Sequence, residues 1–265
     1  ILKFKELRFI MQNEELPTNQ LKERKKMDTI KVQSGKTLMI AHRGLSGIEL
    51  ENTNAAFIAA GNRSHYGIET DVHKTSDGKF VVFHDDTTGR LSETDVHVEE
   101  TSFEALRAIK LHTADGDDTR PELRIPTLKE YINTCKRYDK AAVLELKNEF
   151  TRDEIASICS EIDECGYFDK MIFISFCFEN LVRLRELRPE TTVQFLTDKY
   201  DDTLPQKLHE SAFDLDILYT ELNAENIRAL HNAGVKINCW TCNDKDAADY
   251  LIKNGIDYIT SNILE

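Results

Sequence analysis

The sequence predicts an α/β protein whose parallel strands close into a (β/α)8 barrel. Short apolar, β-branched runs alternate along the chain with amphipathic stretches of helical length. About eight such runs occur, which favours a closed barrel over an open doubly wound sheet. The chain has 265 residues, and barrels of this class commonly have about 250. No Gly-x-Gly-x-x-Gly pattern follows the first run, which weakens the rival dinucleotide-binding fold.

The predicted strands are the runs rich in apolar and β-branched residues, at 38–42, 67–72, 142–146, 171–175, 192–196, 216–219, 236–240 and 257–260. The predicted helices lie between them, at 53–62, 127–138, 152–165, 178–188, 204–211, 224–233 and 244–254. Two of these helices open with a capping box, Thr127 with Glu130 and Thr151 with Glu154. Glycines that favour a helix end follow three of them, at Gly166, Gly234 and Gly255.

A hairpin is predicted where the alternation stops, after the second strand. The polar segment before the next apolar run is too short for a helix, and Asp77-Gly78 within it is a strong signal for a two-residue turn. With that turn Asp71 falls opposite His84, and a bulge would move the register by about one residue. Glu69 and Asp71 are two residues apart, so they share one face of their strand. The hairpin therefore brings Glu69, Asp71 and His84 together.

Two segments fall outside the regular barrel pattern. Residues 86–125 form a polar, small insertion after the second strand and its hairpin, and we expect it to cap one end of the barrel and shape access to it. Residues 1–35 are charged and lack a clear apolar period, which predicts an N-terminal extension, either a helix with a polar face or a mobile arm. The barrel domain is expected to span residues 36–265.

Charge and composition narrow the class of partner. The formal net charge is -13, whereas non-specific nucleic-acid binding needs a basic surface, so DNA and RNA are excluded as the main ligand. No apolar run reaches the ~18 residues that a membrane helix needs, and residues 1–10 lack the apolar core of a signal peptide. The sequence therefore predicts a cytoplasmic protein without stable membrane insertion. Its six cysteines are scattered, unlike a disulfide scaffold, and strand geometry places Cys239 and Cys242 on opposite faces.

Acidic side chains mark two of the predicted strands. In a (β/α)8 barrel the active groups lie at the C-terminal ends of the strands. The strand at 67–72 carries Glu69 and Asp71, and the strand at 142–146 carries Glu145 near its end. Three carboxylates form an all-oxygen site that suits Mg²⁺ or Ca²⁺ rather than Zn²⁺. The sequence thus predicts one divalent metal there, where it would polarise a phosphoryl oxygen.

Two histidines and two cations are predicted to lie beside this metal. His42 ends the first strand and His84 comes from the hairpin. Both side chains titrate near neutrality, so one can act as a base and the other as an acid. Arg43 and Lys147 can neutralise phosphate charge that grows in the transition state. Each residue alone is more often structural, and it is their convergence at the face where barrels carry out chemistry that indicates an active site.

Short motifs follow one another in order along residues 38–262. They are Ala41-His42-Arg43-Gly44, Glu51-Asn52-Thr53, Glu69-Thr70-Asp71-Val72, Val81-Val82-Phe83-His84-Asp85, Ile125-Pro126-Thr127-Leu128, Glu145-Leu146-Lys147, Ser175-Phe176, Trp240-Thr241 with Asn243, and Gly255-Ile256-Asp257. As an ordered set these motifs resemble the glycerophosphodiester phosphodiesterase family.

The resemblance implies a role for each group of residues. In such an enzyme a barrel with a small insertion would hydrolyse a glycerophosphodiester, its small-molecule substrate, to an alcohol and glycerol 3-phosphate. The resemblance implies a divalent metal on Glu69, Asp71 and Glu145, an acid/base pair in His42 and His84, and phosphate contacts from Arg43 and Lys147. It also places Glu51 near the metal, and Phe176 and Trp240 along the pocket for the glycerol or the leaving group.

Two rival functions remain beside this reading. The first is a lysophospholipase D-like phosphodiesterase, which would need an apolar rim for an acyl chain, and the second is a non-catalytic phosphate-ester binding protein. The polar insertion disfavours the first rival, and the intact set of histidines and carboxylates disfavours the second. The last strand, Ile259-Thr260-Ser261-Asn262, departs from the usual family pattern. We expect this departure to alter the substrate pocket without touching a catalytic group.

Overall fold

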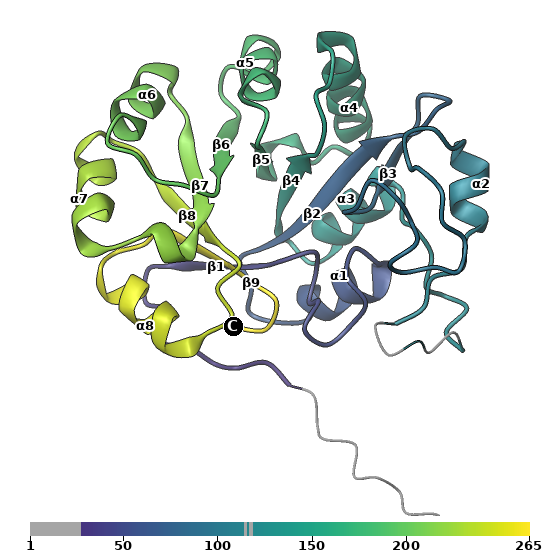
Figure 1. Ribbon diagram of the computed structural model, residues 1–265, viewed down its shortest axis with the longest axis horizontal. Coiled ribbons are helices and arrows are strands. Elements are labelled where there is room, and N and C mark those ends of the chain that lie inside the picture. The colour runs from purple at the N-terminus through teal and green to yellow at the C-terminus, as the bar shows by residue number, and fades with distance from the viewer. Residues whose placement is uncertain (1–27, 114–115, 117–118) are drawn as a thin grey trace, which may run out of the picture.

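The computed structural model describes residues 28–113, 116 and 119–265, and its strands form a closed barrel (Figure 1). The nine-stranded sheet has the order β1-β9-β8-β7-β6-β5-β4-β2-β3, and β1 also pairs with β2, which closes the ring. Every pairing is parallel except that of β3 with β2, so the (β/α)8 barrel predicted from the sequence is confirmed. The strands are β1 (Leu38–Ala41), β2 (Gly67–Lys74), β3 (Phe80–Val82), β4 (Ala141–Leu146), β5 (Met171–Ser175), β6 (Thr192–Thr197), β7 (Asp214–Leu218), β8 (Ile237–Trp240) and β9 (Tyr258–Ser261).

The helices lie outside the barrel and cover its outer surface (Figure 1). The capping boxes at Thr127 and Thr151 are both present, and Gly166 ends α4 in the left-handed conformation with φ 61°. None of the described helices is long and apolar enough to span a membrane. The helices are α1 (Asn54–Gly61), α2 (Phe103–Ala108), α3 (Leu128–Arg137), α4 (Arg152–Cys165), α5 (Phe178–Leu187), α6 (Leu204–Ser211), α7 (Ala224–Asn232) and α8 (Lys245–Lys253), with short 3-10 turns η1 (Phe168–Lys170) and η2 (Tyr219–Glu221).

The interior of the barrel is divided between apolar and polar side chains. One cluster of buried apolar residues fills part of it: Ile40, Ala141, Val143, Ile172, Ile174, Leu196 and Tyr258. Polar side chains are also buried there, and Asn238 links two of them, donating to Gln194 Oε1 at 3.2 Å and accepting from Thr260 Oγ1 at 3.1 Å. Along β4 the inward side chains change from Ala141 and Val143 to Glu145, so the acidic group lies toward the C-terminal end of the strand.

The β2–β3 hairpin differs from the prediction by one residue. Its loop is longer than the predicted two-residue turn, because Thr75 N donates to Lys79 O at 2.8 Å and Gly78 has φ 74°. A three-residue loop with a left-handed glycine is the next commonest hairpin connection. Phe83 N, rather than His84 N, consequently bonds to Asp71 O, at 3.1 Å. The predicted pairing of Asp71 with His84 is therefore wrong by one residue.

The segment at residues 86–125 contains α2 and a small apolar core of its own. Beyond β3, α2 lies at the edge of the molecule (Figure 1). The core also takes in Val81 and Phe83 of the hairpin, and its buried residues are Leu50, Val81, Phe83, Leu91, Val98, Leu106, Ile109, Leu111, Leu123 and Ile125. Arg107 on α2 donates to both carboxylate oxygens of Glu130 on α3, at 2.9 and 3.1 Å. This segment is thus packed against the hairpin that carries His84.

The described residues before β1 pair with the C-terminal residues. Ile30 bridges to Leu264, and the backbone of Glu265 bonds to Ile30 and to Val32. The Glu265 carboxylate is buried and accepts from Thr29 Oγ1 at 2.6 Å and from Ser64 Oγ at 2.7 Å. The rest of the predicted N-terminal extension, residues 1–27, lies outside the described residues.

Replacing Glu265 by alanine is expected to lower the free energy of unfolding by about 1–3 kcal/mol near neutral pH, since buried donors lose their acceptor. Burial opposes ionisation, but Lys31, Thr29 and Ser64 lower the pKa of Glu265. Its contribution is therefore present above the pKa of an unfolded glutamate and is lost as the pH falls through the folded value. Denaturant titrations at several pH values should show a difference that shrinks in acid. A matching loss in Glu100→Ala, at an exposed position, would contradict this.

Candidate active site

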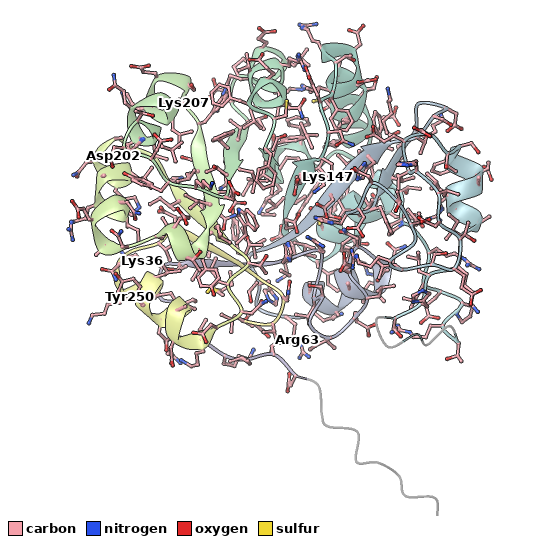
Figure 2. All side chains as sticks on the ribbon, in the orientation of Figure 1. Lys36, Arg63, Lys147, Asp202, Lys207 and Tyr250 are labelled. Atoms are coloured by element: carbon pink, nitrogen blue, oxygen red, sulfur yellow. The ribbon has the colours of Figure 1, made fainter. Side chains whose placement is uncertain are left out.

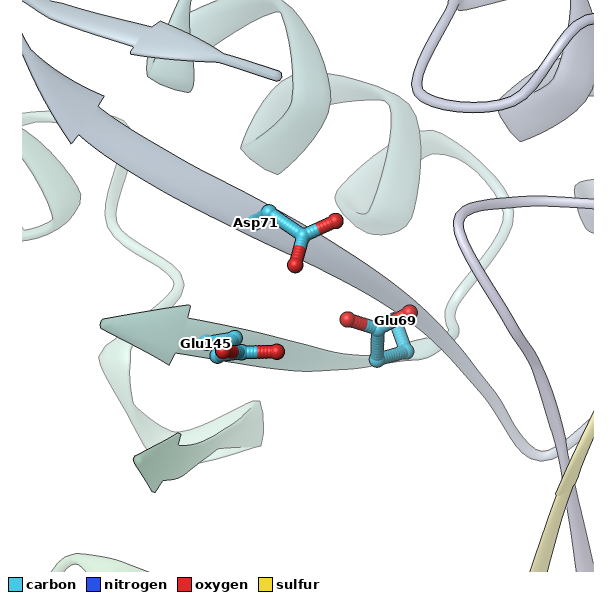
Figure 3. Close-up of side chains that lie close together, drawn as sticks. All are labelled: Glu69, Asp71 and Glu145. Atoms are coloured by element: carbon cyan, nitrogen blue, oxygen red, sulfur yellow. The ribbon is translucent and has the colours of Figure 1, made fainter. Parts of the chain in front are cut away.

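Three carboxylates from two neighbouring strands meet inside the mouth of the barrel. Asp71 on β2 is the register partner of Glu145 on β4, and Glu69 lies two residues earlier on β2. Each of the three offers an oxygen, and these oxygens all lie within 4.8 Å of one another. Figure 3 shows the side chains extending toward a common space. The structure thus brings the three predicted metal ligands together.

The donor set of this cluster fits a hard divalent cation. All three carboxylates are buried, and within the described residues Asp71 Oδ1 and Glu145 Oε1 accept no hydrogen bond of good geometry and have only ion pairs with Lys147. Burial and the charge of Asp71 raise the pKa of Glu145 to about 8, and burial with both neighbouring carboxylates raises that of Glu69. Despite burial, Lys147 and Arg43 lower the pKa of Asp71. The mutual repulsion of three buried carboxylates opposes ionisation of all three, an effect that a bound metal cation would offset, and Mg²⁺ and Ca²⁺ prefer such oxygen ligands.

The cations Arg43 and Lys147 lie directly beside the carboxylates. Lys147 Nζ forms ion pairs with Glu145 Oε1, at 3.1 Å, and with Asp71 Oδ1, at 3.7 Å. Figure 2 shows Lys147 beside β2. Arg43 N donates to Glu69 Oε2 at 2.7 Å, and its side-chain Nε lies 3.7 Å from Asp71 Oδ2. Both cations are mostly buried, so they are held close to the space between the carboxylates.

The turn that follows β1 aims the Arg43 backbone at Glu69. Arg43 has φ 53° and Gly44 has φ 75°, both in the left-handed region. A Cβ on Gly44 would lie 2.7 Å from Ala56, so only glycine fits there. The next loop contributes Asn52, which donates to Asp71 Oδ2 at 2.7 Å and accepts from Thr70 Oγ1 at 2.7 Å. Asn52 was not among the predicted site residues, although it stands within the Glu51-Asn52-Thr53 motif.

His42 is held by a residue from the end of the chain. Its Nδ1 lies 2.7 Å from Asn262 Oδ1, and an amide oxygen only accepts, so Nδ1 carries the proton. Burial and the charge of Arg43 lower the pKa of His42 to about 4. The expectation that the departure around Asn262 would touch no proposed catalytic group is therefore wrong, because Asn262 contacts His42. The contact joins residues 220 positions apart, which no local pattern could indicate.

His84 has a carboxylate partner instead of an amide. Its Nδ1 donates to Asp85 Oδ1 at 2.6 Å. Partial burial opposes ionisation of Asp85, but hydrogen bonds from Arg90 and His84 lower its pKa to about 2. Burial lowers the pKa of His84, while the charge of Asp71 raises it. In both histidines Nδ1 is engaged by a hydrogen bond, so Nε2 is the ring nitrogen left for other partners. The charge of Asp71 also favours the protonated form of each ring.

The remaining predicted residues lie at the same end of the barrel strands. Glu51 accepts from Arg43 Nη1 at 2.9 Å and does not belong to the carboxylate cluster. Phe176 follows β5 and Trp240 ends β8, and their rings meet edge to face with centroids 5.7 Å apart. Phe176 is 46% exposed, whereas Trp240 Nε1 is buried and has no hydrogen-bond partner within the described residues. The two rings thus form an aromatic contact at the C-terminal ends of β5 and β8.

The chain is similar to known proteins over most of its length. A family model described as "Glycerophosphoryl diester phosphodiesterase family" matches residues 42–264. A glycerophosphodiester phosphodiesterase of Caldanaerobacter subterraneus is 30% identical over 86% of this chain and 94% of that protein. One from Bacillus subtilis is 26% identical over 85% of this chain and 83% of its own length.

Solved structures give the same result. An Oleispira antarctica phosphodiesterase in complex with the product sn-glycerol-3-phosphate superposes with a TM-score of 0.79 at 27% identity, covering 88% of this chain and 96% of that one. A glycerophosphodiester phosphodiesterase from Parabacteroides distasonis superposes with a TM-score of 0.73 at 26% identity, covering 86% and 93%.

Proposed function

Because the chain belongs to the glycerophosphoryl diester phosphodiesterase family, we propose that it hydrolyses a glycerophosphodiester to an alcohol and glycerol 3-phosphate, with one divalent metal and two histidines. The observation that carries the proposal is the buried cluster of Glu69, Asp71 and Glu145, whose oxygens lie within 4.8 Å of one another. Burial raises the pKa values of Glu69 and Glu145, and perturbed carboxyls of this kind are typical of catalytic sites, which favours an enzyme over a non-catalytic binding protein.

Glu69, Asp71 and Glu145 would hold the metal, Mg²⁺ or Ca²⁺. When bound, such an ion polarises a phosphoryl oxygen and offsets negative charge. Arg43 and Lys147 act on the same charge, because the phosphodiester is anionic and its charge increases as the P–O bond breaks. Their ion pairs with Asp71 and Glu145 hold both side chains at the edge of the carboxylate cluster.

The two histidines transfer protons through Nε2, since each Nδ1–H is engaged by an oxygen acceptor. One histidine takes the proton of the attacking hydroxyl while its oxygen bonds to phosphorus. The other donates a proton to the leaving oxygen as its P–O bond breaks. The attacking hydroxyl belongs to water or to the neighbouring carbon of the substrate, and a trapped cyclic phosphate would identify the second route.

The substrate class that fits best is a water-soluble headgroup ester. The exposed large apolar side chains of the described chain are Ile30, Ile58, Tyr66, Phe176 and Tyr250, and none belongs to residues 86–125. A lysophospholipid would need apolar surface along its acyl chain, and Phe176 is the one member of this set that follows a barrel strand at its C-terminal end.

The test is release of glycerol 3-phosphate from glycerophosphocholine and glycerophosphoethanolamine, with and without a chelator. We expect release that the chelator abolishes and that added Mg²⁺ or Ca²⁺ restores. Release from a lysophospholipid but from neither headgroup ester would overturn the proposed substrate class. No release from any of the three, with either metal present, would overturn the reaction itself.

Asn262 provides a second test of the histidine roles. Asn262→Asp places a carboxylate beside His42 Nδ1, which favours the imidazolium and raises the pKa of His42 from about 4. The limb of the pH–rate profile that belongs to His42 should therefore move to higher pH. Asn262→Ala removes the contact and should lower kcat by up to about 100-fold without that shift. Unchanged profiles in both variants would show that His42 takes no part in the proton transfers.

A further inference from the structure

Arg90 lies in the inserted segment and binds two acidic residues of the site at once. Its Nη1 and Nη2 donate to the two carboxylate oxygens of Glu51, at 3.0 and 2.7 Å. Its Nε and Nη2 donate to the two oxygens of Asp85, at 2.5 and 3.1 Å. Paired contacts of this kind fix the orientation of both partners, because the guanidinium is planar and rigid.

Each of these carboxylates in turn holds a group of the proposed active site. Asp85 Oδ1 accepts from His84 Nδ1 at 2.6 Å, and Glu51 Oε1 accepts from Arg43 Nη1 at 2.9 Å. Arg90 is thus linked to His84 through Asp85, and to Arg43 through Glu51. The guanidinium joins two parts of the site that come from different loops.

The geometry leaves Arg90 little capacity to bind phosphate itself. A guanidinium has five N–H donors, and the four contacts to Glu51 and Asp85 leave one of them. Its charge is offset by two carboxylates, and the pKa of Asp85 is held at about 2, so that carboxylate is ionised at neutral pH. An arginine that served mainly as a phosphate ligand would keep its paired donors free.

The loop around Arg90 is anchored in the core of the insertion. The next residue, Leu91, is 3% exposed and belongs to that core, and its N–H bonds to Thr88 O at 3.1 Å. The backbone at this point is consequently fixed relative to the hairpin, which shares the same core. Arg90 extends from a rigid support even though its side chain is 45% exposed.

We propose that Arg90 is a positioning residue through which the insertion fixes the orientation of His84 and Arg43. This inference rests on the proposed function for the roles of those two residues. The insertion then completes the active site instead of only covering it. Without Arg90, Asp85 would lose its guanidinium partner and Glu51 would keep only Arg43, so the carboxylate that holds the His84 ring would no longer be fixed.

The experiment compares Arg90→Ala and Arg90→Lys with Arg120→Ala as the matched control. Arg120 lies in the same insertion and pairs with Glu49 at 2.6 Å, two residues from Glu51. For glycerophosphocholine we expect Arg90→Ala to lower kcat by about 10–100-fold with little change in Tm. Arg90→Lys should recover little, because an ammonium cannot bind two carboxylates in pairs. Added guanidinium ion should restore part of the activity of Arg90→Ala, and Arg120→Ala should behave as wild type.

A second readout does not depend on activity. Two-dimensional ¹H–¹⁵N spectra of the histidine rings report the tautomer of His84, with its signals assigned by their loss in His84→Ala. We expect Arg90→Ala to weaken the Nδ1–H form and Arg120→Ala to preserve it. Unchanged kcat and unchanged His84 signals in Arg90→Ala, or equal losses in Arg120→Ala, would overturn the inference. An inactive wild type would overturn the proposed function alone, and the spectra would still decide whether Arg90 orients His84.

Discussion

His84→Ala is expected to lower kcat by about 10²–10⁴-fold, the usual contribution of one positioned acid or base. Folding should be unaffected, since the ring is only partly buried and its removal leaves Asp85 paired with Arg90. The measurement is kcat for glycerophosphocholine, together with Tm and metal affinity. A severe loss of kcat with unchanged metal affinity would separate a role in proton transfer from a role in building the metal site.

The control for this variant is His231→Ala. His231 Nε2 lies 2.9 Å from Asp257 Oδ2, so it forms the same type of histidine–aspartate pair. It belongs to α7 and its partner precedes β9, at the N-terminal end of the barrel strands. Near-normal turnover in His84→Ala, or an equal loss in His231→Ala, would refute the acid/base assignment.

The same decrease in kcat is expected for His42→Ala. The double variant, His42→Ala with His84→Ala, tests whether the two residues act together or independently. Groups that act in one chemical step are strongly non-additive. We therefore expect the double variant to be little worse than either single variant. Multiplied losses would mean that His42 and His84 contribute independently to the same rate-limiting step, because losses in two successive steps do not multiply in kcat.

The barrel and most of the site could be predicted because they follow from short-range patterns. Alternating strand and helix periods predict the barrel, and the C-terminal ends of parallel strands necessarily lie at one face. Asp71 and Glu145 could therefore be placed together, and they are register partners. The hairpin register was missed by one residue because Asp-Gly suits both a two-residue turn and the longer loop that forms here, with Gly78 at φ 74°.

The contacts that Asn262 and Arg90 make around the proposed catalytic groups could not be predicted in the same way. Asn262 contacts His42 across 220 positions of sequence, and Arg90 binds Glu51 across 39. Arg90 also stands in a polar segment without hydrophobic periodicity, where pattern does not indicate which side chains face the site. Such contacts depend on how loops pack over the barrel, and loop packing leaves little trace in local sequence.

The second prediction with a large expected effect concerns metal binding, whose affinity should depend on pH. In the metal-free protein, burial raises the pKa values of Glu69 and Glu145, the latter to about 8. A cation binds the ionised carboxylates, so protons compete with it and its affinity should increase from about pH 6 to about pH 8. The folded pKa values lie above the unfolded ones, so the metal-free fold loses stability as pH rises through this range. The increase in Tm produced by Mg²⁺ or Ca²⁺ over a chelator should therefore be greater at about pH 8 than at about pH 6.

Glu145→Gln tests whether this increase in Tm belongs to the cluster. The amide cannot ionise, so we expect it to abolish most of the increase and to lower kcat by more than the 10–100-fold typical of an outer partner. Asp216→Asn is the matched control, because Asp216 is another buried barrel carboxyl with a pKa raised by burial, outside the cluster of three. Asp216→Asn should change how the stability of the metal-free protein depends on pH, and it should retain the increase in Tm produced by metal. If Glu145→Gln responds to metal as wild type does, the cation binds elsewhere, because loss of one of only three carboxylate ligands must weaken a site built from them.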